Sequence, residues 1–167
     1  WTSIENVTPT ELDNFFRKDT IRGYVHDEAA AIFGGVSANA GLFANAQSIS
    51  VICQMLLNDG KFKGKQILKS KVVKEFTDSP LAKEGIYRGL GFDKPQLSGD
   101  SPTCGCVSMS SFGHTGFTGI MTWADPITEI VYVFVSNRTY PTNPINTLSK
   151  EHIREDIQRI INEAIIN

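Results

Sequence analysis

The segment 111–119 gathers the residues most able to do chemistry. It reads Ser-Phe-Gly-His-Thr-Gly-Phe-Thr-Gly, so an imidazole and two hydroxyls lie between glycines. Glycine weakens strands, and this density makes sense where another group must approach the backbone closely. Such a segment can bind a carbonyl or carboxylate through main-chain N–H groups. Taken alone, the same pattern also fits a glycine-rich bend with a satisfied histidine.

The composition is that of a soluble globular domain. The chain has 167 residues, of which 41% are hydrophobic and 20% charged, and its formal net charge is -2. That length can bury one core without staples. The charge balance argues against nucleic acid as a partner, which would require a basic surplus. No apolar run reaches the ~20 residues that span a bilayer, so no membrane-spanning segment is expected.

Hydrophobic periodicity predicts several helices. Thr8 and Glu11 resemble a capping box around Pro9, which favours a helix carrying Leu12 and the two following phenylalanines. Further helices are expected at 28–33, at 46–58 with Asn45 as cap, at 70–76 with Ser70 as cap, and at 150–166 with Ser149 as cap. The last helix carries an apolar stripe that we expect to dock on a sheet: Ile153, Ile157, Ile160, Ile161, Ala164 and Ile165.

Two strand-like runs lie at 119–123 and 130–136. Asp125-Pro126 separates them with turn character, so they are expected to form an antiparallel hairpin. The run 131–135 has no polar interruption, which favours a central strand covered on both faces. The expected fold class is α+β, with an antiparallel sheet and a C-terminal helix packed on it. We expect one domain, mainly helical over 1–88, with the sheet hairpin and terminal helix over 89–167.

The three cysteines form no disulfide framework. Cys104 and Cys106 flank one glycine, and a bridge so short would be strained. Three ordinary thiols are therefore expected, at Cys53, Cys104 and Cys106. A metal or redox pair formed by Cys104 and Cys106 with His114 is the alternative, although the spacing is not that of a zinc ribbon or finger.

Several separated motifs, taken together, resemble the C-terminal part of serine beta-lactamase-like proteins, a group that includes class C beta-lactamases, penicillin-binding proteins and related esterases. They occur in the same order as in that group: Thr8-Pro9-Thr10-Glu11, Val25-His26-Asp27-Glu28, Gly34-Gly35-Val36, Ala40-Gly41-Leu42-Phe43, Gly113-His114-Thr115-Gly116-Phe117-Thr118-Gly119, Trp123-Ala124-Asp125-Pro126 and Val133-Phe134-Val135-Ser136-Asn137-Arg138. The resemblance covers nearly the whole chain and implies a partial beta-lactamase or transpeptidase-like fold.

The family uses a Ser-x-x-Lys box, a Tyr-x-Asn or Ser-x-Asn box, and a Lys-Thr-Gly-type box on a strand. Only the third matches here, as His114-Thr115-Gly116, and no Ser-x-x-Lys occurs. Ser37-Ala38-Asn39 matches the second on paper. However, it lies in a segment that follows that box in the family, so we interpret it as a coincidence. The nucleophile and base are expected in an upstream, N-terminal part of the same protein, and this chain alone is expected to be inactive.

The resemblance also implies roles for the matching residues, placed at the start of a strand facing a cleft. The Phe117 N–H would be an oxyanion donor, and Gly116 would leave room for substrate. The Thr115 hydroxyl would bind a substrate carboxylate or the catalytic network. His114 would hydrogen-bond the serine or base, and its place at the family's lysine position weakens a claim of penicillin hydrolysis.

Other positions are weaker candidates. Asn39 and Ser48 depart from residues common in close relatives, which puts substrate details in doubt. His26, Asp27 and Glu28 either line the cleft or belong to a solvated loop with Asp27 as a helix cap. His152 is expected at the surface and Arg138 in a local pair. No metal or organic cofactor is expected.

The implied function is acyl-enzyme hydrolysis of an amide, ester or beta-lactam in a periplasmic or otherwise extracytoplasmic bacterial protein. A small molecule or peptide would be the substrate. A non-catalytic module that binds peptidoglycan-like peptides is the alternative, because two of three boxes are absent. The sequence before Trp1 discriminates between them.

Overall fold

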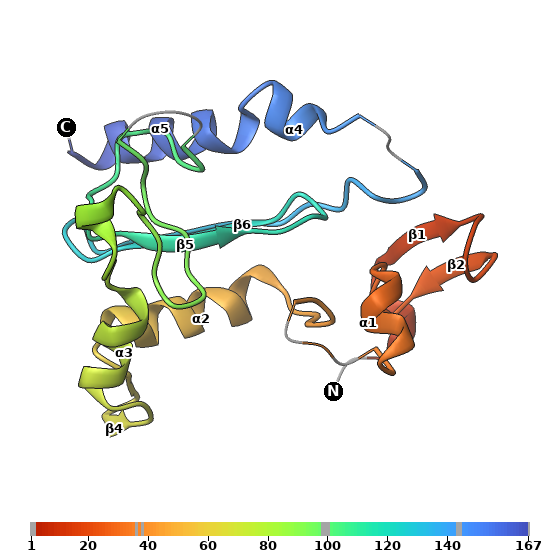
Figure 1. Ribbon diagram of the computed structural model, residues 1–167, viewed down its shortest axis with the longest axis horizontal. Helices are drawn as coiled ribbons and strands as arrows, with labels where there is room; N and C mark the ends of the chain where they lie inside the picture. The colour runs from red at the N-terminus through yellow and green to blue at the C-terminus, as the bar shows by residue number, and fades with distance from the viewer. Residues whose placement is uncertain (1–2, 36, 38, 98–100, 143–144, 167) are drawn as a thin grey trace.

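A three-stranded antiparallel sheet forms the centre of the molecule, with helices on both of its faces (Figure 1). The structure is a computed structural model that describes residues 3–166 except 36, 38, 98–100 and 143–144. The strands are β5 (Phe112–Thr115), β6 (Met121–Asp125) and β7 (Ile130–Phe134), in the order β5-β6-β7. The α+β fold class predicted from the sequence is confirmed.

The predicted hairpin is β6 and β7. Trp123 pairs with Tyr132, and the register runs without a bulge from Met121 to Asp125. The side chain of Asp125 accepts the Ile127 N–H at 2.9 Å, which fixes the turn. Helices cover β7 on both faces, as predicted. The central position of β7 is wrong for the described residues, because β6 lies between β5 and β7.

Helix α2 (Ala46–Leu57) covers one face of the sheet. Its N-terminus is capped as predicted, because the Asn45 side chain accepts the Ser48 N–H at 2.8 Å. Asparagine at this position satisfies an N–H that the first helical turn leaves unbonded. The helix packs its apolar side chains on the sheet, in a cluster of Cys53, Phe112 and Ala124 with Ile49, Leu56, Leu57, Phe92 and Val131.

The opposite face is covered by α5 (Ile153–Ile166), which follows the short helix α4 (Thr147–Lys150). Asn146 caps α4 with its side chain, so the predicted Ser149 cap of one long helix is wrong. His152 has a φ of 49° at the break between the two helices and is exposed, as predicted.

Helix α5 packs on the sheet as predicted, but the predicted docking face is only partly right. Of its isoleucines, Ile161 packs on the buried cluster of Met121, Trp123 and Tyr132. Ile160 and Ile165 are 65% and 60% exposed, whereas Gln158 and Asn162 are buried.

The N-terminal segment forms a hairpin instead of the predicted helix. Strands β1 (Pro9–Asp13) and β2 (Asp19–Arg22) pair antiparallel. The Asp13 carboxylate accepts the N–H groups of Phe15, Phe16 and Arg17, so the chain reverses where the apolar stripe suggested a helix. Backbone bonds from beyond β7 also hold β1 extended, since the Leu12 N–H donates to the Pro141 carbonyl at 2.9 Å.

The remaining elements are short: η1 (Ile4–Asn6), α1 (Glu28–Ile32), β3 (Lys61–Phe62), β4 (Lys65–Gln66), α3 (Ser70–Thr77) and η2 (Ala82–Glu84). The Asp27 side chain accepts the Ala30 N–H and caps α1, so the prediction of a helix cap at Asp27 is confirmed. Ser70 is the first residue of α3 rather than its cap, and Lys69 at the cap position makes no side-chain bond. Within the described ranges, no helix has the length and apolar character needed to cross a membrane.

Candidate functional site

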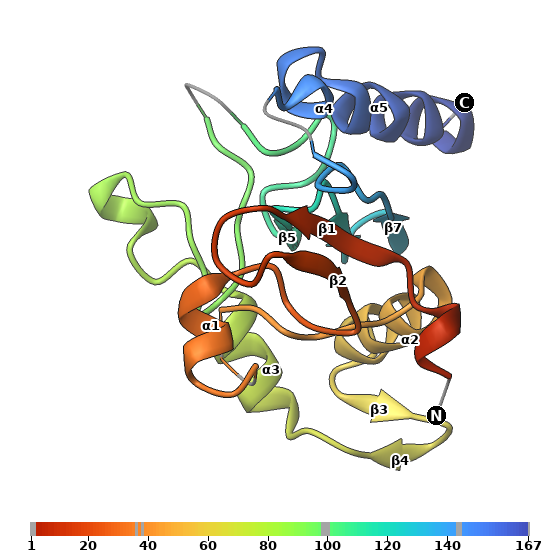
Figure 2. The same ribbon diagram turned by 90° about the vertical axis from the view of Figure 1, so that its right-hand side faces the viewer.

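The β1–β2 hairpin lies beyond one end of the three-stranded sheet (Figures 1 and 2). A cleft of about 580 Å³ is lined by Thr10 of β1, by Val25 and His26, and by the end of β5. The four residues chosen from the sequence, His114, Thr115, Gly116 and Phe117, all line it. Residues from the N-terminal quarter of the chain line it as well. The cleft is therefore built from segments far apart in the sequence.

The sequence predicted that the His114-Thr115-Gly116 triplet begins a strand. This prediction is wrong, because the triplet lies at the end of β5. His114 and Thr115 are the last residues of β5, and Gly116 opens the turn to β6. The Gly119 N–H donates to the Gly116 carbonyl at 2.9 Å, and the Gly116 N–H donates to the Ile120 carbonyl at 2.7 Å. These two bonds close a tight turn with Phe117 near its tip.

Among the described residues, the outer edge of β5 is paired only near its beginning. Gly113 exchanges two backbone bonds with Asp93, at 2.7 and 3.1 Å. Further along, the Phe117 N–H has no hydrogen-bond partner among the residues that the structure describes. Phe117 is 64% exposed and lines the cleft, so this N–H can bond water or the oxygen atom of a bound ligand.

The surroundings of the three glycines in the motif differ, so glycine has a different role at each position. A Cβ on Gly113 would lie 2.4 Å from the Trp123 ring, so the indole occupies the space above it. Gly119 has a φ of +95° and no room beside Ser136. At Gly116 a Cβ would meet only Ile120, at 3.3 Å, and this is the glycine that lines the cleft. Only Gly116 therefore fits the predicted role of leaving space for a ligand.

His114 is held from two sides and is 48% exposed. Its Nδ1 lies 2.6 Å from the Thr115 carbonyl oxygen, and its Nε2 lies 3.9 Å from the Asp93 carboxylate. Asp93 is itself paired with Arg88. The imidazole is thus oriented beside an acidic group without being buried.

Two other side chains contact the Phe117 ring, and neither contact was predicted from the sequence. The His26 ring stacks on it with centroids 4.8 Å apart and an interplanar angle of 12°. The Arg138 guanidinium carbon lies 4.3 Å from the Phe117 centroid. Cation–π and ring stacking of this kind fix an otherwise exposed side chain. His26 therefore belongs to the cleft, which the sequence had left open.

Arg17 holds His26 in place through the backbone. Its guanidinium donates to the carbonyls of Val25 and His26 at 2.6 and 2.7 Å. It also pairs with Glu11 at 2.9 Å and Asp13 at 2.8 Å. The hydrogen bond from Arg17, with those from the backbone, lowers the pKa of Asp13 well below its usual range. Burial raises the pKa of Glu11, and the charge of Arg17 partly opposes that rise.

The Ser-x-Asn match at 37–39 lies closer to the site than expected. Ser37 and Asn39 line the cleft and are hydrogen-bonded through their side chains. Ala38 lies outside the described residues. Thr122 lines the same cleft and contacts the Cys53 sulfur at 3.2 Å, and burial raises the pKa of that thiol.

The described residues hold no cluster of three or more His, Cys, Asp or Glu side chains suited to a metal ion. Cys104 and Cys106 form a disulfide instead, so the expectation of three free thiols is wrong. Gly105 between them has a φ of +70° with open space at its Cβ position. This left-handed conformation, which glycine adopts freely, lets the chain fold back on itself and brings the two cysteines together.

Comparison with known proteins places these features in context. A family model described as Beta-lactamase matches residues 5–151. A protein of Escherichia coli strain K12 named "Putative D-alanyl-D-alanine carboxypeptidase" is 40% identical over 131 residues, which is 77% of this chain and 29% of that protein. Proteins of the same name from Salmonella agona and Salmonella typhi are 38% and 37% identical over 132 residues, with the same coverage. The chain thus spans less than a third of the length of these relatives.

Proposed function

Because the chain belongs to the beta-lactamase family, we propose that it supplies the strand-edge half of an acyl-transfer site in a longer serine hydrolase. In this proposal a serine from an N-terminal part of the same protein attacks a substrate carbonyl and forms an acyl-enzyme, which water then cleaves. The observation that carries it is the Phe117 N–H, which has no partner among the described residues and belongs to a residue that lines the cleft.

Each residue of the motif has a role in this proposal. The Phe117 N–H donates to the oxyanion, for which a donor fixed before reaction is the most effective arrangement. The Thr115 hydroxyl binds a substrate carboxylate, and Gly116 leaves the space that the substrate backbone occupies. His114 hydrogen-bonds the serine or the base. The stack of His26 and Arg138 on the Phe117 ring supports this assignment, because it restrains the residue that carries the donor.

The proposed substrate is a peptide that ends in D-alanyl-D-alanine, which is the substrate that the relatives' names state. Esters and beta-lactams share the reacting carbonyl and remain within the same reaction class. An extracytoplasmic location belongs to the proposal as well. The Cys104–Cys106 disulfide supports it, since disulfides persist in oxidising compartments.

In this proposal an N-terminal part of a longer protein completes the site, and the relatives are longer than this chain. Two uncovered surfaces support a docking partner. Strand β7 is bonded to β6 alone within the described sheet, and the isoleucine side of α5 faces outward. An open strand edge and an exposed apolar stripe are the surfaces on which further elements of a domain pack.

The alternative is a non-catalytic module that binds the same peptides. The absence of a Ser-x-x-Lys box from the printed sequence favours it. A Ser-x-x-Lys box in the coding sequence upstream of Trp1 would support the enzyme, and an unrelated domain there would support the module.

The experiment is a titration of the isotope-labelled chain with a short peptide ending in D-alanyl-D-alanine, followed by amide NMR. We expect the Phe117 and Thr115 amide signals to shift most, and Gly116→Val to abolish the shifts while signal dispersion survives. Ile127→Val, at an exposed position that does not line the cleft, is the control. Shifts that leave Phe117 untouched would contradict the assignment.

Covalent labelling tests the division of roles between the two parts. The isolated chain is expected to form no adduct with a fluorescent penicillin, because it lacks the nucleophile box. A stoichiometric label on one serine of this chain would contradict that expectation.

A further inference from the structure

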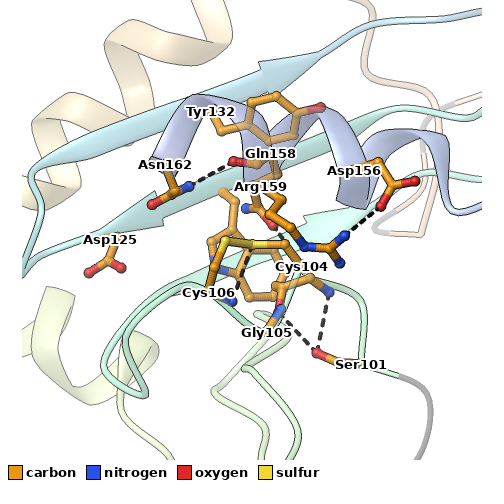
Figure 3. Close-up of a disulfide and its surroundings, with 12 residues drawn as sticks. Ser101, Cys104, Gly105, Cys106, Asp125, Tyr132, Asp156, Gln158, Arg159 and Asn162 are labelled. Carbon is orange, nitrogen blue, oxygen red and sulfur yellow. Dashed lines mark hydrogen bonds and ion pairs between the residues drawn. A yellow bond between two sulfur atoms is a disulfide. The ribbon is translucent and has the colours of Figure 1, made fainter. Parts of the chain in front are cut away.

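The disulfide between Cys104 and Cys106 spans a single residue, and it lies on the α5 side of the sheet (Figure 3). The Cα atoms are 5.2 Å apart, within the ordinary range for disulfides. The stabilisation that a bridge gives by restricting the unfolded chain falls as the closed loop becomes shorter. A bridge across one glycine restricts very little chain, so a role as a structural staple does not explain it.

The loop around the bridge is attached to the sheet without it. The Ser108 N–H and hydroxyl donate to the Asp125 carboxylate at 2.7 and 2.6 Å. The Trp123 indole N–H donates to the Ser111 hydroxyl at 2.9 Å. Val107 packs on the buried cluster beneath α5. Opening the bridge would leave these contacts in place, so the folded loop can tolerate both redox states.

The two sulfur atoms are not equivalent. The Cys106 N–H donates to the Cys104 sulfur at 3.3 Å. The Cys104 N–H is bonded in turn to the side chain of Gln158, at 3.0 Å, which fixes that end of the loop to α5 (Figure 3). A hydrogen bond to sulfur stabilises negative charge on it, and a lower thiol pKa makes a sulfur leave faster in exchange. Cys104 is therefore the better leaving group.

The third cysteine provides a contrast within the same chain. Cys53 is only 8% exposed and lies in the core under α2, where burial raises its thiol pKa. Cys104 and Cys106 are only half-buried. Thiol chemistry follows access and thiolate character. Cys104 and Cys106 are thus more exposed than Cys53, which is an internal standard for a buried thiol.

We propose that Cys104–Cys106 is a thiol–disulfide exchange site for small thiols, attacked at the Cys106 sulfur. An external thiolate forms a bond to the Cys106 sulfur, the bond between the two cysteines breaks, and its electron pair leaves on the Cys104 sulfur. A second external thiolate then attacks the external sulfur of this mixed disulfide and releases the Cys106 thiolate. In sum, the bridge and two thiols give two cysteine thiols and one external disulfide, with the thiol protons transferred to the cysteines.

The exchange site is independent of the proposed acyl transfer. Gln158 belongs to the helix on the face of the sheet opposite α2, whereas His114 pairs with Thr122, which contacts Cys53 of α2. Neither cysteine lines the cleft that holds Phe117. Each of the two proposals can therefore fail without the other.

The experiment uses the unmodified chain and reduced glutathione as the probe. Air-oxidised protein is treated with glutathione under native conditions, quenched with N-ethylmaleimide, and mapped by mass spectrometry of its peptides. We expect glutathione on Cys106 in roughly tenfold excess over Cys104, the preference that one hydrogen bond to a charged atom can produce. Maleimide should label Cys104 in the same molecules, and Cys53 only after unfolding.

A second measurement separates an exchange site from a structural bridge. Full reduction with dithiothreitol is expected to leave the thermal midpoint within a few degrees of the oxidised value, because the bridge restricts so little chain. Free Cys104 and Cys106 thiols in the air-oxidised chain, glutathione shared equally between them, resistance to reduction in the folded state, or unfolding on reduction would each overturn the proposal.

Discussion

Helices α2 and α5 pack on opposite faces of the same sheet with opposite kinds of side chain (Figure 1). The side of α2 that meets the sheet is apolar, with Cys53 buried and Ile49, Leu56 and Leu57 around it. The side of α5 that is buried is mostly polar. Its buried residues follow each other at helical spacing, as Arg154, Glu155, Gln158 and Asn162. Ile157, Ile160 and Ile165 of α5 are exposed.

The polar side of α5 is buried because most of it has partners. The Gln158 side chain accepts the Cys104 N–H, and the Asn162 side chain donates to the Gln158 carbonyl at 3.0 Å. The Tyr132 hydroxyl donates to the Arg154 carbonyl at 3.0 Å. Within the described residues Arg154 Nε, Glu155 Oε2 and Asn162 Oδ1 still lack partners. Periodicity therefore identifies the apolar side of a helix, but a hydrogen-bonded polar side can face the nearest sheet.

The largest expected effect is the difference in free energy of unfolding between alanine variants of two neighbouring isoleucines. Ile161→Ala should lower the free energy of unfolding by about 2 kcal/mol, the lower end for large-to-small changes, because Ile161 is half-buried on the Trp123 cluster. Ile160→Ala is the matched control and should change it by less than ~0.5 kcal/mol, because Ile160 is 65% exposed. Chemical denaturation measures both. Equal losses would mean that the isoleucine stripe is covered in solution.

A smaller effect is expected on the polar side of α5. Gln158→Ala removes the acceptor of the Cys104 N–H and should cost about 1–2 kcal/mol, because the donor is left unsatisfied next to a buried position. Arg159→Ala on the exposed side breaks a surface ion pair with Asp156, and should cost less than ~0.5 kcal/mol. If the two variants are equally stable, the buried polar contacts of α5 contribute nothing and the comparison with α2 loses its physical basis.

The same contrast separates what could be predicted from the sequence from what could not. The cap of α2 and the hairpin of β6 and β7 depend on neighbouring residues, such as Asn45 and the Asp125-Pro126 turn, and were predicted. The β1–β2 hairpin depends partly on the local bonds of the Asp13 carboxylate to the residues that follow it. It depends also on bonds between residues more than 100 positions apart, such as Leu12 with Pro141, which no local pattern reveals. The capping-box match at Thr8 and Glu11 was therefore misleading.

The candidate site divides in the same way. The Gly-His-Thr-Gly motif predicted a strand segment beside a cleft, because glycine, histidine and hydroxyl residues are visible in the sequence, but it lies at the end of β5 and not at the start of a strand. His26 was left undecided, since Arg17 holds it through main-chain carbonyls that belong to any residue type. Gly105 next to the cysteines was the available signal for the Cys104–Cys106 bridge. Gly105 allows the bridge because it adopts a positive φ, and the sequence alone does not show that φ.

The smallest effect is confined to high pH and concerns the Tyr132 hydroxyl under α5. Burial, with the nearby charge of Glu155, raises the pKa of Tyr132 to about 12, and the charge of Arg154 partly opposes the rise. Between about pH 10 and 12 the unfolded chain has lost this proton while the folded chain keeps it. The unfolded state then binds fewer protons, so the free energy of unfolding should fall as pH rises through this window and be unaffected at neutral pH. Tyrosinate absorbance should show a step near pH 12 that Tyr132→Phe removes, and that variant should also lose this part of the pH dependence. A step that persists in Tyr132→Phe would mean that the hydroxyl is not enclosed by the polar side of α5.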